Sequence, residues 1–412
     1  MGVKIGIIGG GAAGMFCAVR AAMLGAEVTL FEKNERMGRK LGITGKGRCN
    51  LTNACDTKEF IANIVTNKKF MYTASAALTS FALMDFFENE IGVPLKVERG
   101  NRVFPVSDKA SDIVMGLVNK MKALGVRIIH DNVTDILTDE GKVTGLRCGH
   151  HIHHFDRVVL ATGGASYPLT GSDGSGYRMA KRLGIEVTPI TGSLIPLVSA
   201  ERDIPKMQGL ALKNISIEVT DTVKNKVIYH DFGELLFTHF GLSGPVILSA
   251  SAHMRPMEKG RFKVSIDLKP ALDEATLDAR LLSDFEKYKN KNLGNSLSDL
   301  LPQKMIPVFI DRLGISEDRK INSITKDERR KMIAILKSFE VTINGKRPID
   351  EAIITSGGID VSEITPKTME SKKISGLYFA GEVIDLDAYT GGFNLQIAFS
   401  TANLAAISAC EE

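Results

Sequence analysis

The N-terminal segment alternates between short apolar runs and a glycine-rich turn, a pattern that predicts a βαβ unit. Lys4–Ile8 is an apolar run typical of a strand, and the glycines after it lead into an apolar helix that extends to about Leu24. Gly25 ends that helix, and Glu27–Phe31 forms a second apolar run. Parallel strands joined by a crossover helix imply a doubly wound α/β sheet.

The next segments fit the same architecture. Residues 34–53 have no clear period, so they predict either a long ordered loop or a bent helix. Residues 71–90 look helical, and so do residues 108–124, which carry an apolar stripe of helical spacing and have Ser107 as a candidate N-cap. Residues 126–160 alternate around turns and predict strands, the last of which leads into a second glycine-rich segment.

The pattern changes near residue 190, where alternating β-branched runs indicate an antiparallel β region that continues to about residue 270. Residues 271–345 look mostly helical. The residues after them are again apolar and rich in glycine, as in the first half of the chain. The predicted fold is therefore a Rossmann-like domain with a parallel sheet, made of residues 1–190 and 346–412. It is interrupted by an inserted substrate or cap domain over residues 191–345, β-rich first and helical afterwards.

Composition narrows the function classes. The 412 residues include 52 Lys and Arg against 48 Asp and Glu, and this near balance gives no support to a dominant polyanion-binding role, so nucleic acid is not expected as a partner. The five cysteines form no CxxC pair, as expected for a reduced, cytoplasmic protein. The uncharged run from Ile5 to Val19 is too short and too rich in glycine to span a bilayer, so no membrane role is expected. A small-molecule substrate is expected, and the oligomeric state stays open.

The first chemical motif is Gly9-x-Gly11-x-x-Gly14, placed between a predicted strand and a helix. Gly9 permits the tight turn, Gly11 lets the backbone approach a pyrophosphate, and Gly14 lets helix and strand pack closely. The N–H groups at the helix N-terminus then face the phosphate charge. Glu32 ends the second strand 18 residues after Gly14, which suits a carboxylate that binds ribose hydroxyls.

Three further glycine-rich segments follow in order. Residues 39–50 combine glycines with four cations and would hold phosphates or the electron-rich edge of a flavin. The strand end at 158–164 lets the chain pass close to a bound dinucleotide. At 377–382 a carboxylate follows a glycine and can bind a ribityl hydroxyl, and the glycines of 391–396 let a helix N-terminus face the pyrimidine carbonyl of a flavin. Four such elements in this order predict an FAD site.

With these motifs, the sequence resembles the two-dinucleotide-binding-domain flavoproteins. Within them it is similar to the BaiN-like family, also described as NAD(P)/FAD-dependent oxidoreductases or aminoacetone oxidase family FAD-binding enzymes. The stretches that carry the resemblance are GRKLGITGKGRCNLTN at 38–53, ATGGASYPLTGSDGSGY at 161–177, GELLFTHFGLSGP at 233–245 and GLYFAGEVIDLDAYTGGFNLQIAFS at 376–400. The resemblance implies FAD, an inserted domain and redox chemistry. One departure is Ser400-Thr401-Ala402, where the family usually has a glycine that affects helix packing.

Cys49 could be a nucleophile, although a small packing residue is the favoured interpretation. The absence of a second GxGxxG motif argues against a dedicated nicotinamide-binding domain, so NAD(P)H is expected only as a transient donor. No metal site is expected at the histidines of 150–154.

The motifs and the resemblance together assign the cofactor contacts. The predicted FAD contacts are Gly9, Gly11, Ala12, Ala13, Gly14, Glu32, Lys33, Arg39, Lys40, Thr44, Gly45, Gly47, Arg48, Cys49, Asn50, Ala161, Thr162, Gly163, Gly164, Gly381, Glu382, Gly391, Gly392, Phe393, Asn394 and Gln396.

The catalytic residues are less well defined by the sequence. His239, inside the insertion, is a candidate proton donor near neutral pH or else a histidine with only a structural hydrogen bond, and Lys46 and Tyr389 are weaker candidates. Three functions compete. The favoured one is an FAD-dependent reductase of an activated C=C bond that uses NAD(P)H, with steroid or bile-acid-like enones as one class implied by the resemblance. The alternatives are an FAD-dependent oxidase of a small amine such as aminoacetone, which would produce hydrogen peroxide, and a non-catalytic flavoprotein that binds a partner or RNA.

Overall fold

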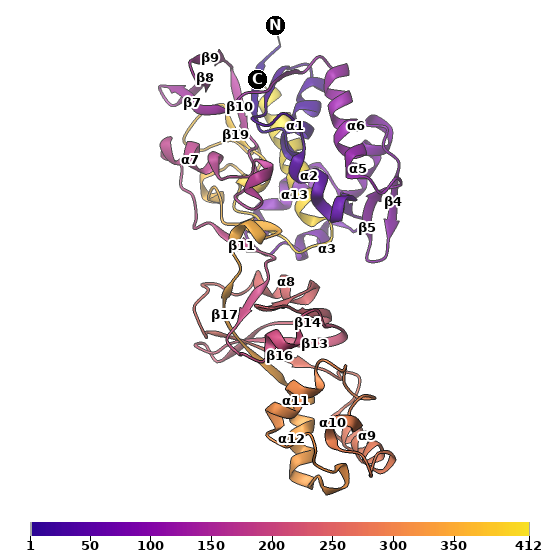
Figure 1. Ribbon diagram of the computed structural model, residues 1–412. Coiled ribbons are helices and arrows are strands. Elements are labelled where there is room, and N and C mark those ends of the chain that lie inside the picture. The colour runs from indigo at the N-terminus through magenta and orange to yellow at the C-terminus, as the bar shows by residue number, and fades with distance from the viewer. Residues whose placement is uncertain (1, 412) are drawn as a thin grey trace. The chain divides into compact units, whose positions relative to one another are not determined.

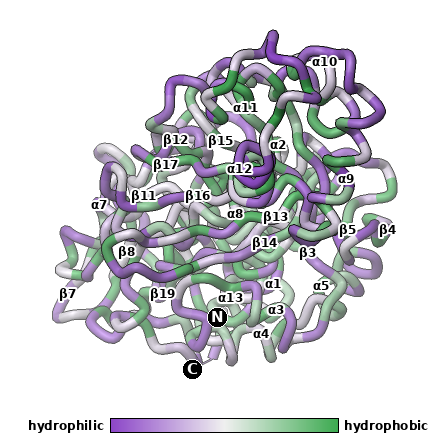
Figure 2. Tube along the Cα trace, turned by 90° about the horizontal axis from the view of Figure 1, so that it is seen from below, coloured by the Kyte–Doolittle hydropathy of each residue, from purple (hydrophilic) through white to green (hydrophobic). Residues whose placement is uncertain are grey.

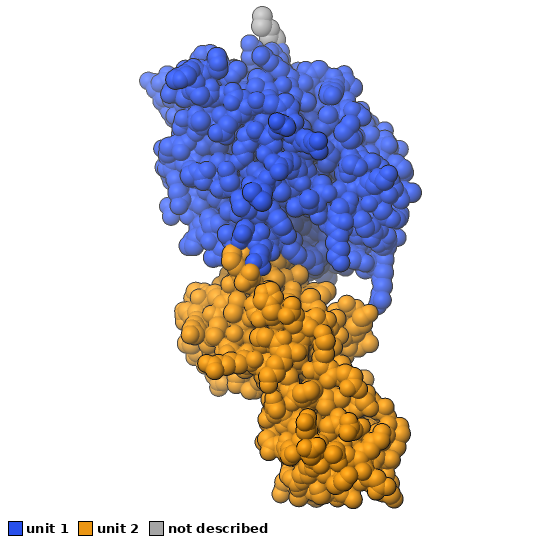
Figure 3. All heavy atoms as spheres, in the orientation of Figure 1, with its two compact units in different colours: residues 1–193, 349–412 blue, residues 194–348 orange. Residues whose placement is uncertain are grey.

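The computed structural model describes residues 2–411, which divide into two compact units (Figure 3). Unit 1 contains residues 1–193 and 349–412, and unit 2 contains residues 194–348. Both boundaries of the insertion lie three residues further along the chain than the sequence pattern predicts.

Unit 1 is built on a five-stranded parallel sheet with the strand order β19-β10-β1-β2-β6, of which Figure 1 labels β10 and β19. In β1, β2, β10 and β19 most residues are buried, because helices cover the sheet, whereas the edge strand β6 is only partly buried. The predicted Rossmann-like sheet is therefore confirmed. The strands are β1 (Lys4–Ile8), β2 (Glu27–Phe31), β6 (Arg127–Ile129), β10 (Arg157–Leu160) and β19 (Leu377–Phe379).

Three long helices surround this sheet: α1 (Ala12–Met23), α6 (Ala110–Ala123) and α13 (Phe393–Cys410). α1 packs against both of the others, and the ring of Phe16 on α1 lies 5.2 Å from that of Phe399 on α13. α13 is buried along almost its whole length and has no polar face, which its mostly green tube in Figure 2 reflects. These helices fix the two glycine-rich turns that precede α1 and α13.

The helical prediction for residues 71–90 is confirmed, and the segment consists of α4 (Tyr72–Ala77), α5 (Ser80–Asp85) and a π-helical turn over Phe86–Glu90. The predicted N-cap of the next helix is wrong. Ser107 does not cap α6, which begins at Ala110 after Lys109. Asp108 between them has a φ of 57°, so the chain makes a left-handed turn and the Ser107 hydroxyl accepts a hydrogen bond from Lys109 N outside the helix.

The segment 34–53 is a bent helix, α2 (Arg39–Gly47), in which Thr44, Gly45 and Lys46 leave helical geometry. The other elements of unit 1 are short helices and small antiparallel sheets at its periphery. They are α3 (Thr57–Ala62), α7 (Ser175–Arg182), the sheet of β3 (Thr52–Asn53), β5 (Arg102–Pro105) and β4 (Leu95–Glu98), the sheet of β7 (Val133–Asp139), β8 (Lys142–Cys148) and β9 (His151–His154), and the pair of β11 (Thr191–Ser193) and β18 (Ile354–Ser356).

Unit 2 contains a closed six-stranded barrel whose interior is filled by alternate apolar residues such as Ile217, Val264 and Val341. The last barrel strand corrects the prediction that the mostly helical segment extends to residue 345. It alternates Phe339, Val341 and Ile343 inward, a period of two that the preceding helical pattern obscures. The barrel strands are β12 (Leu197–Ser199), β13 (Ala211–Asp221), β14 (Lys226–Phe237), β15 (Gly241–Ser243), β16 (Phe262–Asp267) and β17 (Phe339–Lys346).

The helices of unit 2 lie mostly between β16 and β17 in the chain. Thr325 and Glu328 form a reciprocal capping box at the start of α12, and Asp273 caps α9, so both ends are defined by side-chain hydrogen bonds. The helices are α8 (Pro245–Ser251), α9 (Glu274–Lys287), α10 (Leu293–Ser296), α11 (Ile306–Leu313) and α12 (Lys326–Lys337). Within residues 2–411 no single helix is long and apolar enough to cross a bilayer, although a bent pair, 68–77 with 80–90, passes that test by length and composition.

Candidate cofactor-binding site

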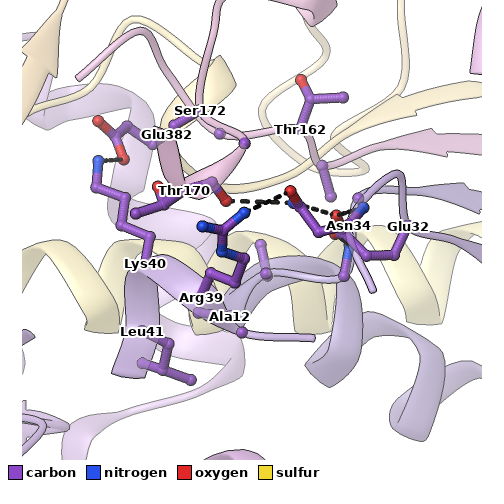
Figure 4. Close-up of a pocket in the computed structure, with 18 of the residues that line it drawn as sticks. Ala12, Glu32, Asn34, Arg39, Lys40, Leu41, Thr162, Thr170, Ser172 and Glu382 are labelled. Carbon is purple, nitrogen blue, oxygen red and sulfur yellow. Dashed lines mark hydrogen bonds and ion pairs between the residues drawn. The ribbon is translucent and has the colours of Figure 1, made fainter. Parts of the chain in front are cut away.

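A long pocket opens in unit 1 at the carboxyl ends of β1, β2 and β10 (Figure 4). Its walls come from the turn after β1, the residues after β2, helix α2, the segment after β10 and the start of α13. It encloses about 1230 Å³ of empty space, including its open mouth. In open parallel sheets ligands bind at this edge, where the glycine-rich turns let the backbone approach them.

The turn between β1 and α1 has the geometry that the GxGxxG motif predicts. Gly9 has a φ of 108°, and a Cβ atom on Gly14 would lie only 1.8 Å from the carbonyl oxygen of Gly9. A Cβ atom on Gly11 would meet nothing within 4 Å, although Gly11 lines the pocket. Gly9 and Gly14 are therefore needed for the chain itself, whereas Gly11 leaves space beside the first turn of α1, where a phosphate group would bind.

Glu32 sits at the end of β2 with its carboxylate turned back toward this turn. Its Oε2 accepts a hydrogen bond from Gly10 N at 2.7 Å, and its Oε1 accepts from Asn34 N at 2.8 Å and Asn34 Nδ2 at 2.6 Å. An ionised carboxylate has about four acceptor positions, so one remains for a ribose hydroxyl. Arg39 donates to Asn34 Oδ1 at 2.9 Å and completes the network (Figure 4).

A second polar group lies at the other side of the pocket, where Figure 4 shows Lys40 and Glu382 far from Glu32. Lys40 Nζ lies 2.6 Å from Glu382 Oε2 and also donates to the Ser166 hydroxyl at 2.8 Å. Glu382 Oε1 accepts from Thr355 N at 2.9 Å. This group joins residues from α2, the segment after β10, β18 and the turn after β19.

The residues present fit FAD at two places in the pocket. The space beside Gly11, where a Cβ atom would meet nothing within 4 Å, leaves room for a phosphate group at the first turn of α1. The spare acceptor position of Glu32 is the second feature that a dinucleotide would fill.

The pocket brings together many of the residues that the sequence assigns to FAD. It also contains residues absent from the predicted contacts. Residues 170–172 lie in the quoted stretch 161–177 but have no assigned role, Asn34 belongs to no motif, and Ile353 and Ile354 follow the insertion without any glycine signal. The predicted residues that line it are Gly9, Gly11, Ala12, Ala13, Glu32, Lys33, Arg39, Lys40, Thr44, Ala161, Thr162, Gly163, Glu382 and Asn394.

Other predicted contacts do not line the pocket. Gln396 is buried and bonds to the Thr52 hydroxyl, Leu78 O and the Ser400 hydroxyl, so its amide is committed to the protein. Arg48 pairs with Glu98 and Asp108, which raise the pKa of its guanidinium. The predicted contacts outside the pocket wall are Gly14, Gly45, Gly47, Arg48, Cys49, Asn50, Gly164, Gly381, Gly391, Gly392, Phe393 and Gln396.

Cys49 is fully buried, and burial raises the pKa of its thiol to about 12. A thiol that stays protonated at neutral pH is a poor nucleophile, which agrees with a packing role. The three catalytic candidates lie outside the pocket wall. Lys46 is exposed on the bent part of α2 and Tyr389 is half-buried before α13, while His239 is exposed on unit 2 beside Phe240. Their catalytic roles stay predictions.

The sheet, the glycine-rich turn and the insertion define the class of protein: the chain is an FAD-dependent oxidoreductase with a Rossmann-like cofactor domain. It belongs to the HI0933-like protein family, whose Rossmann-domain model matches residues 3–408.

Curated relatives match the chain over nearly its full length. The ribosomal RNA dihydrouridine synthase of Escherichia coli is 33% identical over 401 residues, which cover 96% of this chain and 95% of the relative. The 3-dehydro-bile acid delta(4,6)-reductase of Clostridium scindens is 30% identical over 420 residues, 99% of each chain. Among solved structures, a variant of the Escherichia coli quinol fumarate reductase subunit FrdA has a TM-score of 0.52 at 17% identity, with 99% of this chain and 70% of that chain covered, a likeness of fold alone.

Proposed function

We propose that this protein reduces a C=C bond conjugated to a carbonyl group, that NAD(P)H is the electron donor, and that the substrate is a uracil base in ribosomal RNA. The observation that carries the proposal is the chemistry shared by the names of the two relatives. Dihydrouridine is uridine with two hydrogens added across C5=C6, a bond conjugated to the C4 carbonyl. A delta(4,6)-reductase of a 3-dehydro bile acid acts on double bonds conjugated to a 3-oxo group.

RNA is favoured as the substrate because the two dihydrouridine synthases are 33% and 34% identical to this chain over 96% and 98% of its length. This departs from the expectation drawn from net charge. A net charge of +4 argues against a protein that coats a polyanion, but it does not exclude one that docks a single RNA segment on a local basic surface.

The pocket residues have separable tasks in this reaction. FAD, when bound, supplies the two-electron redox chemistry. The turn at Gly11 and the carboxylate of Glu32 would hold its diphosphate and a ribose. The Lys40–Glu382 pair fixes the other side of the pocket, where a ribityl hydroxyl can bind the carboxylate. A reduction of this kind also needs a proton donor, and His239 is the candidate for that role.

The test is anaerobic stopped-flow spectroscopy of the purified holoprotein, mixed first with NADH or NADPH and then with an unmodified ribosomal RNA transcript. We expect the flavin absorbance to bleach with a reduced nicotinamide and to return when the RNA is added. Nucleoside mass spectrometry should then find dihydrouridine in the RNA. If the flavin is not bleached by either nucleotide, or if bleached enzyme leaves the RNA unchanged, the proposal is wrong.

The bile-acid reductase supports a second candidate substrate, a steroid 3-oxo-4-ene or 4,6-diene. A steroid enone in place of RNA in the second mixing step distinguishes the two. Return of the absorbance with the enone and not with RNA would favour this candidate. The amine oxidase alternative predicts a different result. Amines would bleach the flavin, and dioxygen alone would rapidly restore its absorbance and form hydrogen peroxide.

A further inference from the structure

We propose that a basic surface around the β4–β5 hairpin of unit 1 binds the phosphate backbone of the RNA substrate beside one end of the cofactor pocket. This inference rests on the proposed function and adds the surface that recognises the substrate. The surface, called here the Phe104 cluster, consists of Lys46, Arg48, Arg99, Arg102 and Phe104.

Two arginine side chains of the cluster lie against the ring of Phe104. The Arg48 guanidinium lies over the ring at 4.1 Å and that of Arg102 lies 5.9 Å from its centroid. Arg102 Nε donates to the backbone carbonyl of Arg99 at 3.0 Å, which holds the two arginines of the hairpin turn together. A Cβ atom on Gly45 would touch the Phe104 ring at 3.4 Å, so Lys46, the next residue, belongs to the same surface.

Some cations of this surface form ion pairs with carboxylates and others do not. Arg48 pairs with Glu98 and Asp108, and Lys96 pairs with Asp108, so those charges stay within the protein. Lys46, Arg99 and Arg102 are exposed, and none of them forms an ion pair with a carboxylate of residues 2–411. Residues 46–48 and 94–109 together carry six Lys and Arg against two acidic residues. This local surplus of four positive charges is not apparent from the nearly balanced numbers of acidic and basic residues in the whole chain.

The cluster borders the pocket. Asn53 Nδ2 donates to both Gly100 O, in the hairpin turn, and Gly391 O, three residues before the pocket-lining Asn394. On the α2 side, Thr44 lines the pocket, and a Cβ atom on the next residue, Gly45, would lie 3.4 Å from the Phe104 ring. These residues are on the Lys40 and Leu41 side of the pocket, which Figure 4 shows away from Glu32, the ribose ligand. A dinucleotide whose adenosine ribose binds Glu32 would have its redox-active end on this side.

The position excludes the phosphates of FAD as the ligand of these cations, because the glycine-rich turn that receives them lies next to Glu32. An anion that binds these cations would therefore be one that arrives with the substrate. A single uracil base carries no charge, and a bile acid carries one carboxylate, whereas RNA carries a phosphate at every nucleotide. Three exposed cations, two on the β4–β5 hairpin and Lys46 on α2, suit two or three consecutive phosphates, as in other contacts that position a nucleic acid without reading its sequence.

The test compares Arg99→Ala/Arg102→Ala holoprotein with a matched control, Lys122→Ala/Arg127→Ala. The control removes two exposed cations at the far end of α6 and on β6. The affinity for an unmodified ribosomal RNA transcript is measured by fluorescence anisotropy at several salt concentrations. Each lost phosphate contact lowers the slope of log affinity against log salt by about one. The Arg99/Arg102 variant is expected to lose about two units of slope and about tenfold in affinity, and the control to match the wild type.

A conservative variant distinguishes the loss of charge from a folding defect. Arg99→Lys/Arg102→Lys keeps both charges, so its salt slope should match the wild type even if the packing on Phe104 is weakened. Unchanged affinity and slope in the Arg99→Ala/Arg102→Ala variant would overturn the inference. If instead the wild-type protein itself neither binds nor reduces the RNA, the proposed function fails, and this outcome is distinct from a failure of the surface alone.

Discussion

Lys40 and Glu382 are separated by 342 positions in the chain, yet the Lys40 ammonium lies 2.6 Å from the Glu382 carboxylate. The pair joins the bent helix α2 to the turn after β19, so it closes the pocket wall across two distant motifs. Both side chains are largely buried, with exposed fractions of 22% and 13%. Sequence reasoning assigned both residues to FAD without finding that they bind each other.

Lys40→Met should destabilise the apoprotein by about 2 kcal/mol. Removing one partner of a fully buried pair typically costs roughly 3–5 kcal/mol, because the other charge stays without compensation, and the partial exposure of this pair reduces that figure. Urea unfolding of the apoprotein measures the change. The double variant Lys40→Met/Glu382→Gln removes the lone charge and should recover at least half of the loss. A double variant no more stable than Lys40→Met would show that the charge pair is not the cause.

The two glycines of the first turn should respond differently to alanine. Gly14→Ala places a methyl group 1.8 Å from Gly9 O, so β1 and α1 must move apart, at a cost of about 3 kcal/mol or more. Gly11→Ala meets nothing within 4 Å and should change apoprotein stability by at most about 1 kcal/mol, since it replaces an N-cap glycine. Its methyl group would occupy the space for the diphosphate, so the FAD dissociation constant should rise at least about tenfold. Equal FAD affinity in Gly11→Ala and wild type would place the diphosphate elsewhere.

Glu32→Gln should weaken FAD binding by about 10- to 100-fold. A hydrogen bond to a charged group contributes about 1.5–3 kcal/mol, and the neutral amide also loses one of its acceptor atoms to an NH₂ group, which faces the N–H donors of Gly10 or Asn34. Quenching of flavin fluorescence on titration of the apoprotein gives the dissociation constant. Glu35→Gln is the matched control, because Glu35 is exposed and lies outside the pocket wall. Similar losses in both variants would mean that net charge, not the carboxylate of Glu32, governs the affinity.

The local motifs of unit 1 are predictable because each depends on short-range geometry. The strand–turn–helix around Gly9–Gly14 and the position of Glu32 follow from spacing alone, and the structure has both at the pocket. Ser107 fails as an N-cap for a similar local reason, since the left-handed turn at Asp108 is not encoded by any glycine. β17 is missed because a single strand follows four helices in the chain and completes a barrel whose other strands lie far upstream.

The pairings of charged side chains could not be predicted. Arg48 looks like a phosphate ligand in the sequence. In the structure its guanidinium instead donates hydrogen bonds to Glu98, on β4, and to Asp108, after β5. The sequence separation of 50 and 60 residues gives no signal for that contact. The same folding leaves Arg99 and Arg102 without carboxylate partners in the described part of the chain, which is why the Phe104 cluster emerges only from the structure.

The buried thiol of Cys49 makes the stability of the protein fall at alkaline pH. Burial raises its pKa in the folded protein to about 12, against a usual value near 9. Below pH 9 the thiol is protonated in both states and has no effect. Above pH 9 the unfolded chain loses this proton while the folded chain keeps it, so the free energy of unfolding falls by about 1.4 kcal/mol per pH unit for this group.

Cys49→Ala removes this contribution and should therefore lose stability less steeply than the wild type between pH 9 and about 11, as urea unfolding at each pH would measure. Cys410→Ala is the control, because that thiol is only partly buried and should alter the slope less. The same buried thiol should also react slowly with a disulfide reagent at pH 8 in the folded protein, since only the thiolate attacks. Rapid modification of Cys49 at that pH, or equal slopes in Cys49→Ala and wild type, would restore the nucleophile interpretation that its burial argues against.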